Sequence, residues 1–309
     1  MAMTSILLAG CGLVAIGAFA FHRLVHRGLA PERLHESRSP GHLGLPYEEV
    51  IIPTENGKRL FGWWVRTPRK GKTATVVILH GWGGNAEMML PLLGPLHEAG
   101  FTVLLFDARC HGRSDEDDFT SLPRFAEDLQ HALDWLRGQA SVDPHNISLV
   151  GHSVGAGAAL LVASQRNDLA AVVSLAAFSH PASMMRRYLA AKRIPFLPLG
   201  WIILRYVQNV IGYRFDDIAP VTTIRQVSCP TLLLHGANDT IVPVAEARAI
   251  YNARTGDHVM LKIVAGSHNE FGDPGDIADE VGELVSFLLD SRVYLFLPGN
   301  PQASGELFW

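Results

Sequence analysis

Ser153 is a candidate nucleophile because of the residues around it. It lies at the centre of Gly151-His152-Ser153-Val154-Gly155, which fits the pattern G-x-S-x-G. A short apolar run precedes this motif, and a run of small residues follows it. That context predicts a sharp turn from a strand into a helix, with the serine hydroxyl projecting out of a sheet. A serine hydroxyl is a poor nucleophile at its ordinary pKa, so the sequence must also supply a base.

His268 and Asp239 are the candidates for that base and for the acid that orients it. Each follows shortly after a separate apolar run. The carboxyl ends of parallel strands meet at one edge of an open α/β sheet, where such sheets place their ligands. We therefore expect both side chains to reach Ser153, with His268 taking the serine proton and Asp239 stabilising the imidazolium. Asp257 and Asp273 are less well placed as the acid.

A glycine-rich segment, His80–Gly84, follows an earlier apolar run and could stabilise negative charge. Attack on an acyl carbon creates an oxyanion, which needs hydrogen-bond donors aimed at it in advance. The backbone N–H groups of Val154 and Trp82 are the two donors that we expect to form this oxyanion hole. We also expect Gly81, Trp82 and His152 to bind the substrate, with the Trp82 indole as a wall of the site.

The same glycine-rich segment allows a dinucleotide-binding alternative. Residues 81–86 fit G-x-G-x-x-A, and Asp107 lies at the end of the next apolar run, as in a nicotinamide-binding unit. This alternative leaves Ser153, Asp239 and His268 without a role. In the hydrolytic interpretation, Asp107 and Arg109 instead have a structural role, in which they hold the turn after that run.

The elements that must position these residues alternate between strands and helices. Two runs, 47–52 and 59–66, predict a hairpin around Glu55-Asn56-Gly57. After the hairpin, short continuous apolar runs indicate strands buried on both faces, and segments such as 124–137 and 244–255 have helical character. The expected buried strands are 74–79, 101–106, 146–150, 171–176, 231–234 and 259–264. This alternation predicts an α/β fold with a mostly parallel central sheet and helices on both faces.

A helical lid is expected over residues of about 178–225. Between His180 and Arg214 the sequence contains no acidic residue, and basic side chains alternate with large apolar ones. The basic residues are Arg186, Arg187, Lys192, Arg193, Arg205 and Arg214. Two interpretations stay open: solvated cations over a packed helix pair, or a surface that meets anionic lipid headgroups.

The N-terminus carries an apolar run over residues 6–21, followed at once by Arg23 and Arg27. Its length is near the lower limit for crossing a bilayer, and the position of the charges predicts a membrane anchor over residues 1–27 with a cytoplasmic catalytic domain. One alternative is a lipoprotein cleavage site with Cys11 lipidated. Another is a cleaved leader, or a helix packed on the domain. Residues 28–46 have the composition of a linker.

Composition restricts the remaining possibilities. The chain has 309 residues, 48% of them hydrophobic and 18% charged, which excludes a disordered or fibrous protein. A net charge of −4 argues against nucleic acid as a partner. Three scattered cysteines do not make a disulfide framework or a zinc site. No metal or organic cofactor is expected.

Five motifs together resemble the α/β-hydrolase superfamily. They are H-G-W-G-G at 80–84, D-A-R-C-H-G-R-S at 107–114, G-H-S-V-G at 151–155, H-G-A-N-D-T-I-V-P at 235–243 and G-S-H at 266–268. Their order and spacing are those of the family, and the resemblance covers residues of about 47–289. With Phe215-Asp216-Asp217-Ile218-Ala219-Pro220, the chain resembles most the membrane-anchored serine aminopeptidase and monoacylglycerol-lipase-like branch. The hydrolase domain is then expected over 47–290, and a C-terminal tail over 291–309 has no counterpart in the family pattern.

The resemblance implies a serine hydrolase that cleaves carboxylic esters, including acyl lipids and thioesters, through an acyl-enzyme. The expected partners are a small acyl ester or lipid substrate and a membrane, met by the N-terminal helix and the basic lid. Two alternatives remain open, a serine peptidase and a non-catalytic binding protein that keeps the fold.

Overall fold

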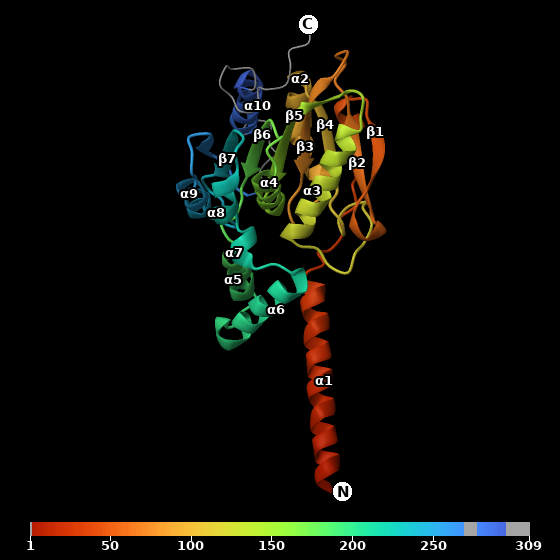
Figure 1. Ribbon diagram of the computed structural model, residues 1–309, viewed down its shortest axis with the longest axis vertical. Coiled ribbons are helices and arrows are strands. Elements are labelled where there is room, and N and C mark those ends of the chain that lie inside the picture. Colours follow the sequence, from red (N-terminus) through yellow and green to blue (C-terminus); the bar gives the residue numbers. More distant parts are fainter. Residues whose placement is uncertain (1, 269–276, 295–309) are drawn as a thin grey trace.

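Eight strands form one sheet at the centre of the molecule. The structure is a computed structural model that describes residues 2–268 and 277–294 (Figure 1). The strands lie in the spatial order β1-β2-β4-β3-β5-β6-β7-β8. Their bounds are β1 Glu48–Pro53, β2 Arg59–Val65, β3 Thr73–Leu79, β4 Thr102–Phe106, β5 Val142–His152, β6 Ala171–Leu175, β7 Thr231–Gly236 and β8 Val259–Val264.

The sheet is antiparallel at one edge and parallel elsewhere. Strand β2 pairs antiparallel with β1 and with β4, and every other pairing is parallel. The carboxyl ends of β3 to β8 therefore lie along a common edge. The predicted α/β class, with a mostly parallel sheet, is confirmed.

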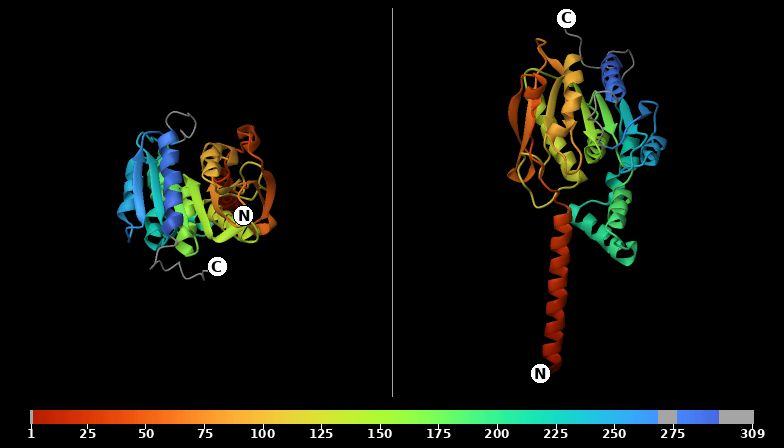
Figure 2. Two further views of the ribbon diagram at one scale, coloured as in Figure 1. Left: turned by 90° about the horizontal axis from the view of Figure 1, so that it is seen from above. Right: turned by 180° about the vertical axis from the view of Figure 1, so that it is seen from behind.

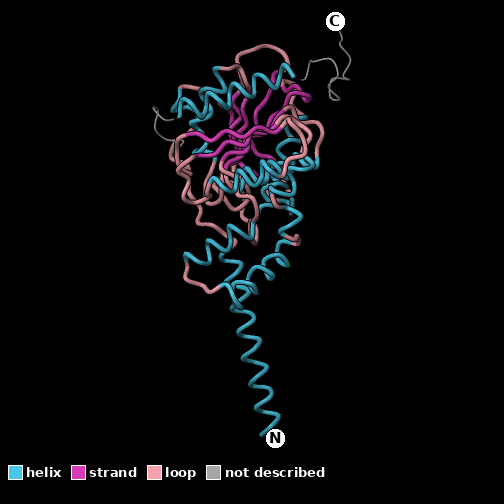
Figure 3. The backbone as a smooth tube through the Cα atoms, turned by 90° about the vertical axis from the view of Figure 1, so that its left-hand side faces the viewer, coloured by secondary structure: helices cyan, strands magenta, loops and turns pink. Residues whose placement is uncertain are grey.

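Helices cover both faces of the sheet, as the continuous apolar strands require. On one face lie α3 (Leu122–Arg137) and α4 (Val154–Gln165), and on the other lie α2 (Leu90–Glu98) and α10 (Ile277–Tyr294) (Figures 1 and 2). Alternate side chains of one strand enter the two cores. In β3, for example, Val77 and Leu79 pack on the α3 side, and Val76 and Ile78 pack on the α2 side. The tube in Figure 3 shows the strands enclosed between these helical layers.

The segment after β6 projects beyond the sheet as a group of helices. It contains α5 (Pro181–Ala191), a π-helical turn (Phe196–Gly200), α6 (Trp201–Ile211), α7 (Phe215–Ile218) and α8 (Pro220–Thr223). Figure 1 shows α5 and α6 beside the C-terminal end of α1. There the Tyr206 hydroxyl lies 2.5 Å from His22 Nδ1, and its ring meets Phe21 edge-on.

Helix α1 (Ala2–Gly28) extends away from the sheet. Over the described residues, no helix combines the length and the apolar character that crossing a bilayer requires. The predicted membrane anchor over residues 1–27, and the membrane localisation derived from it, are therefore wrong. A bilayer core needs about 20 consecutive, predominantly apolar residues. The last turns of α1 instead carry His22, Arg23, His26 and Arg27.

Residues 28–46, expected to act as a linker, are held against two loops of the sheet. The Arg33 guanidinium donates to the carbonyls of Gly112 and Ser114, at 2.7 Å each. Arg38 forms an ion pair with Glu87 at 2.9 Å. At the other end of the chain, residues 291–294 belong to α10. The remainder of the expected tail lies outside the described residues.

Candidate active site

Ser153 occupies a strained turn between β5 and α4. Its backbone angles are φ 53° and ψ −113°, a conformation that non-glycine residues rarely adopt. The two flanking glycines are required by space. A Cβ at Gly151 would lie 2.2 Å from the Gly155 carbonyl oxygen, and one at Gly155 would lie 2.4 Å from that of His80. The motif thus brings β5, α4 and the loop after β3 into close contact, with the serine at their meeting point.

The structure brings Ser153, His268 and Asp239 together. His268 Nε2 lies 3.1 Å from Ser153 Oγ, and His268 Nδ1 lies 2.7 Å from Asp239 Oδ2. All three residues are buried, with exposed fractions of 6–7%. They come from the ends of β5, β7 and β8, which are parallel and close at this edge.

The Asp239 carboxylate is fixed in orientation by its own loop. Oδ1 accepts hydrogen bonds from the backbone N–H groups of Ile241, at 2.9 Å, and Val242, at 2.7 Å. Oδ2 is left to face His268. A carboxylate in this position keeps the imidazole proton on Nδ1, so that Nε2 is the acceptor for the serine hydroxyl.

His152, expected among the substrate-binding residues, lies behind this group. Its Nε2 lies 2.8 Å from the carbonyl oxygen of His268, and the two rings are 4.9 Å apart. Burial, with the neighbouring His268, lowers the pKa of His152 to about 4. A neutral, buried ring that bonds to the backbone of the His268 loop supports that loop.

Trp82 and Val154 lie on the two sides of Ser153. A Cβ at Gly81 would be 3.1 Å from Ser153 Cβ, so the loop after β3 passes directly beside the serine. Val154 is the first residue of α4, where backbone N–H groups have no partner inside the helix. Within the described part of the chain, neither the Trp82 nor the Val154 N–H has a hydrogen-bond acceptor. Trp82 is 39% exposed.

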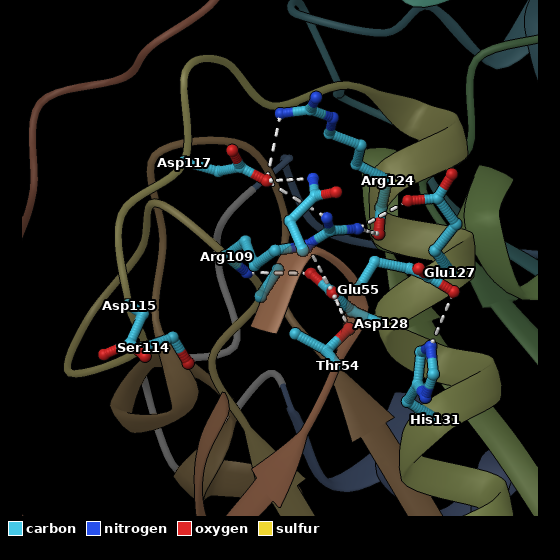
Figure 4. A network of polar contacts seen from close by, with 12 residues as sticks. Thr54, Glu55, Arg109, Ser114, Asp115, Asp117, Arg124, Glu127, Asp128 and His131 are labelled. Atoms are coloured by element: carbon cyan, nitrogen blue, oxygen red, sulfur yellow. Dashed lines mark hydrogen bonds and ion pairs between the residues drawn. The ribbon is translucent and has the colours of Figure 1, made fainter. Parts of the chain in front are cut away.

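A buried ionic network holds the loop after β4, next to the loop that carries Trp82. Arg109 is fully buried and bonds to Asp128 at 2.7 Å, with further ion pairs to Glu127 and Asp117 (Figure 4). The Thr54 hydroxyl donates to the same Asp128 carboxylate at 2.8 Å. This network fixes the turn after β4 to helix α3.

Asp107 closes the same loop from the other side. Its Oδ1 accepts from the N–H of Ala86 at 2.7 Å, and its Oδ2 accepts from that of Arg113 at 2.8 Å. In the dinucleotide alternative this carboxylate would bind a ribose. Because both oxygens are engaged by the backbone, the structure favours the structural role.

His80 and His111 are residues of this site to which sequence reasoning assigned no role. Each lies in one of the two loops, is buried, and bonds to the backbone of the other loop. A signal was present, since a histidine occurs in each of two consecutive strand-end loops. Their mutual contact depends on the pairing of β3 with β4, which no local pattern reveals.

Comparison with known proteins assigns the chain to a family. A family model described as "Serine aminopeptidase, S33" matches residues 70–211. An uncharacterized protein of Mycobacterium tuberculosis, Rv2307c, is 30% identical over 222 residues, which cover 72% of each chain. The uncharacterized protein YfhR of Escherichia coli is 28% identical over 252 residues, which cover 79% of this chain and 81% of that one.

Solved structures agree in fold. An esterase of Pyrococcus furiosus superposes with a TM-score of 0.68 at 23% identity, covering 85% of this chain and 97% of the esterase. Est1E from Butyrivibrio proteoclasticus superposes with a TM-score of 0.61 at 19% identity, covering 79% and 99% of the two chains. The chain belongs to the α/β-hydrolase superfamily, and its family and fold support a hydrolase.

Proposed function

We propose that this protein is a serine hydrolase that cleaves carboxylic ester bonds through an acyl-enzyme. The observation that carries the proposal is the unbroken series of contacts from Ser153 Oγ through the His268 ring to Asp239. In the first step His268 Nε2 takes the hydroxyl proton while Oγ attacks the acyl carbon. The N–H groups of Trp82 and Val154 stabilise the resulting oxyanion.

The tetrahedral intermediate then collapses, and the leaving alcohol takes the proton from His268 Nε2. Water attacks the acyl-enzyme with His268 again as base, and the acid is released from Ser153. Asp239 stays ionised throughout and stabilises the imidazolium. Small-molecule acyl esters are the proposed substrates, and acyl lipids and thioesters share the same chemistry.

Covalent labelling with a fluorophosphonate probe tests this function. The native protein is expected to react at Ser153, and Ser153→Ala should abolish the labelling. Ser164→Ala is the matched control, because Ser164 lies on α4, the helix that begins after Ser153, and its hydroxyl donates to the Leu161 carbonyl at 2.7 Å. A native protein that stays unlabelled would instead support a non-catalytic binding role.

The class of bond is tested with p-nitrophenyl esters, acyl thioesters and aminoacyl p-nitroanilides. We expect the highest kcat/KM on the esters. The family model's description as serine aminopeptidase makes the anilides the critical comparison. Faster turnover of the anilides than of the esters would make this protein a peptidase.

A further inference from the structure

The loops after β3 and β4 are joined by two reciprocal histidine contacts. The Ala108 N–H donates to His80 Nε2 at 3.1 Å, and the Gly83 N–H donates to His111 Nε2 at 3.1 Å. The two rings lie 4.9 Å apart. Each loop thus supplies one histidine that accepts a backbone hydrogen bond from the other loop.

The protonation state of both rings follows from their partners. His80 Nδ1 lies 2.7 Å from the Gly81 carbonyl oxygen, and His111 Nδ1 lies 2.9 Å from that of Arg109. A carbonyl only accepts, so each Nδ1 carries the proton and each Nε2 is an acceptor. Burial lowers the pKa of His111 to about 4 and lowers the pKa of His80 well below its usual range, which keeps both rings neutral.

The His111 ring is anchored on the loop after β4. Its neighbour Arg109 is fixed by the buried ion pair with Asp128, and the ring itself meets Phe125 of α3 edge-on at 5.1 Å. In the loop that it contacts, Gly83 has a left-handed φ of 70° and Trp82 is 39% exposed.

Trp82 is therefore held between two points. On one side Gly81 lies against Ser153, and on the other the Gly83 N–H is bound by His111. We propose that His111 is a positioning residue for ester hydrolysis: it holds the Trp82–Gly83 peptide, and this orients the adjacent Gly81–Trp82 peptide so that the Trp82 N–H faces the oxyanion. This inference rests on the proposed function and assigns a role beyond Ser153, Asp239 and His268.

The consequence is specific to the transition state. The oxyanion exists only after attack, so an ill-placed donor lowers kcat and leaves ground-state binding almost unchanged. Loss of one such donor lowers the rate by about 10²–10³, and its displacement should lower it by a part of that.

Two substitutions separate the acceptor at Nε2 from the rest of the ring. His111→Asn keeps a polar group at the Nδ1 position, next to the Arg109 carbonyl, and lacks an acceptor for the Gly83 N–H. His111→Gln can place Oε1 near the position of Nε2. His258→Phe is the matched control. Like His111, His258 bonds to a backbone carbonyl, here from Nε2 to that of Val227 at 2.8 Å, but it lies at the opposite end of the strands.

With p-nitrophenyl butyrate, His111→Asn is expected to lower kcat about 10- to 100-fold with KM changed less than about 2-fold. His111→Gln should recover most of the loss, and His258→Phe should retain wild-type kcat. Affinity for a trifluoromethyl ketone, which forms an oxyanion on the serine, should fall in parallel with kcat/KM. Affinity for butyrate should not change, whereas a general structural defect would weaken both.

Three results would overturn the proposal: unchanged kcat in His111→Asn, equal loss in the Asn and Gln variants, or a loss confined to KM. Urea unfolding identifies a variant that does not fold, and His111→Phe, which keeps the ring volume but has no acceptor, then replaces His111→Asn. A wild-type protein without fluorophosphonate labelling or turnover would overturn the proposed function, and the role of His111 with it. If the wild type is labelled and active but the His111 variants keep its kcat, only the role of His111 is overturned.

Discussion

At the scale of single residues, the Asp239 loop determines which nitrogen of His268 carries the proton. Two backbone N–H groups bind Asp239 Oδ1, and only Oδ2 faces the histidine. Because the two oxygens have different partners, the site should be sensitive to replacement of the carboxylate by an amide, which has nearly the same shape. A carboxylate accepts at both oxygens, whereas an amide accepts at one atom and donates from the other.

Asp239→Asn should therefore lower kcat by about 10⁴ and leave the fold intact. The amide oxygen is needed by the N–H groups of Ile241 and Val242, so the NH₂ group faces His268 Nδ1 and forces the proton onto Nε2. Steady-state kinetics on p-nitrophenyl butyrate measures the loss. Asp257→Asn, an exposed aspartate, is the control and should keep wild-type turnover. Wild-type kcat in Asp239→Asn would mean that another group orients the base.

At the scale of elements, the strands were largely predictable and their ends were not. Continuous apolar runs located β3, β4 and β7, because these strands are buried on both faces, and a similar run located β8, which is only partly buried. Strand β5 begins at Val142 instead of residue 146, since Val142 pairs with Thr73 across a register shift. Ala176 was predicted to end β6, but its φ of 52° excludes it from the strand. Both differences depend on neighbouring strands and leave no local signature.

The ionic network between the β4 loop and α3 makes a prediction at the same scale. Asp128→Ala removes the fully buried carboxylate that bonds to Arg109 and Thr54, and leaves the buried guanidinium with the more exposed Glu127 and with Asp117 as its remaining carboxylate partners. The free energy of unfolding should fall by about 3–5 kcal/mol, as measured by urea denaturation. Asp134→Ala on the same helix removes an exposed ion pair with Arg137 and should lower the free energy of unfolding by about 0–1 kcal/mol. Equal losses in the two variants would contradict this role of the network.

At the scale of the whole molecule, the segment 28–46 connects α1 to the site region. Its composition is typical of a linker, and the segment contains a short 3₁₀ turn, Pro40–Leu43. Composition could not reveal that Arg33 and Arg38 bond to loops more than 45 residues away along the chain. The candidate site shows the same difference between local patterns and non-local contacts. Ser153, Asp239 and His268 each stand in a local motif, whereas His111 acts through a non-local contact.

The same segment places a second carboxyl group beside Asp107. Glu36 Oε1 is buried next to the Asp107 carboxyl, and burial together with the hydrogen bond and charge of Glu36 raises the pKa of Asp107 well above its usual range. The folded state therefore binds a proton more tightly than the unfolded state, and this contribution to stability is lost as pH rises through the raised pKa.

Glu36→Gln should raise the free energy of unfolding at pH 8 by about 1 kcal/mol, because it removes the like charge. The gain should shrink as the pH falls through the raised pKa of Asp107, because protonation of Asp107 removes the repulsion. Urea denaturation at several pH values measures it. Glu32→Gln, at an exposed position of the same segment, should leave the free energy of unfolding unchanged at every pH. A Glu36→Gln gain that is independent of pH would contradict the carboxyl pairing.

The most direct test of the central claim is to trap the acyl group. Rapid quenching of the wild-type protein with p-nitrophenyl butyrate, followed by peptide mass spectrometry, should find a butyryl group on Ser153 and none in Ser153→Ala. The trapped fraction should rise and then fall as substrate is consumed. Turnover without a butyryl group on Ser153, or with the group on another residue, would contradict the claim.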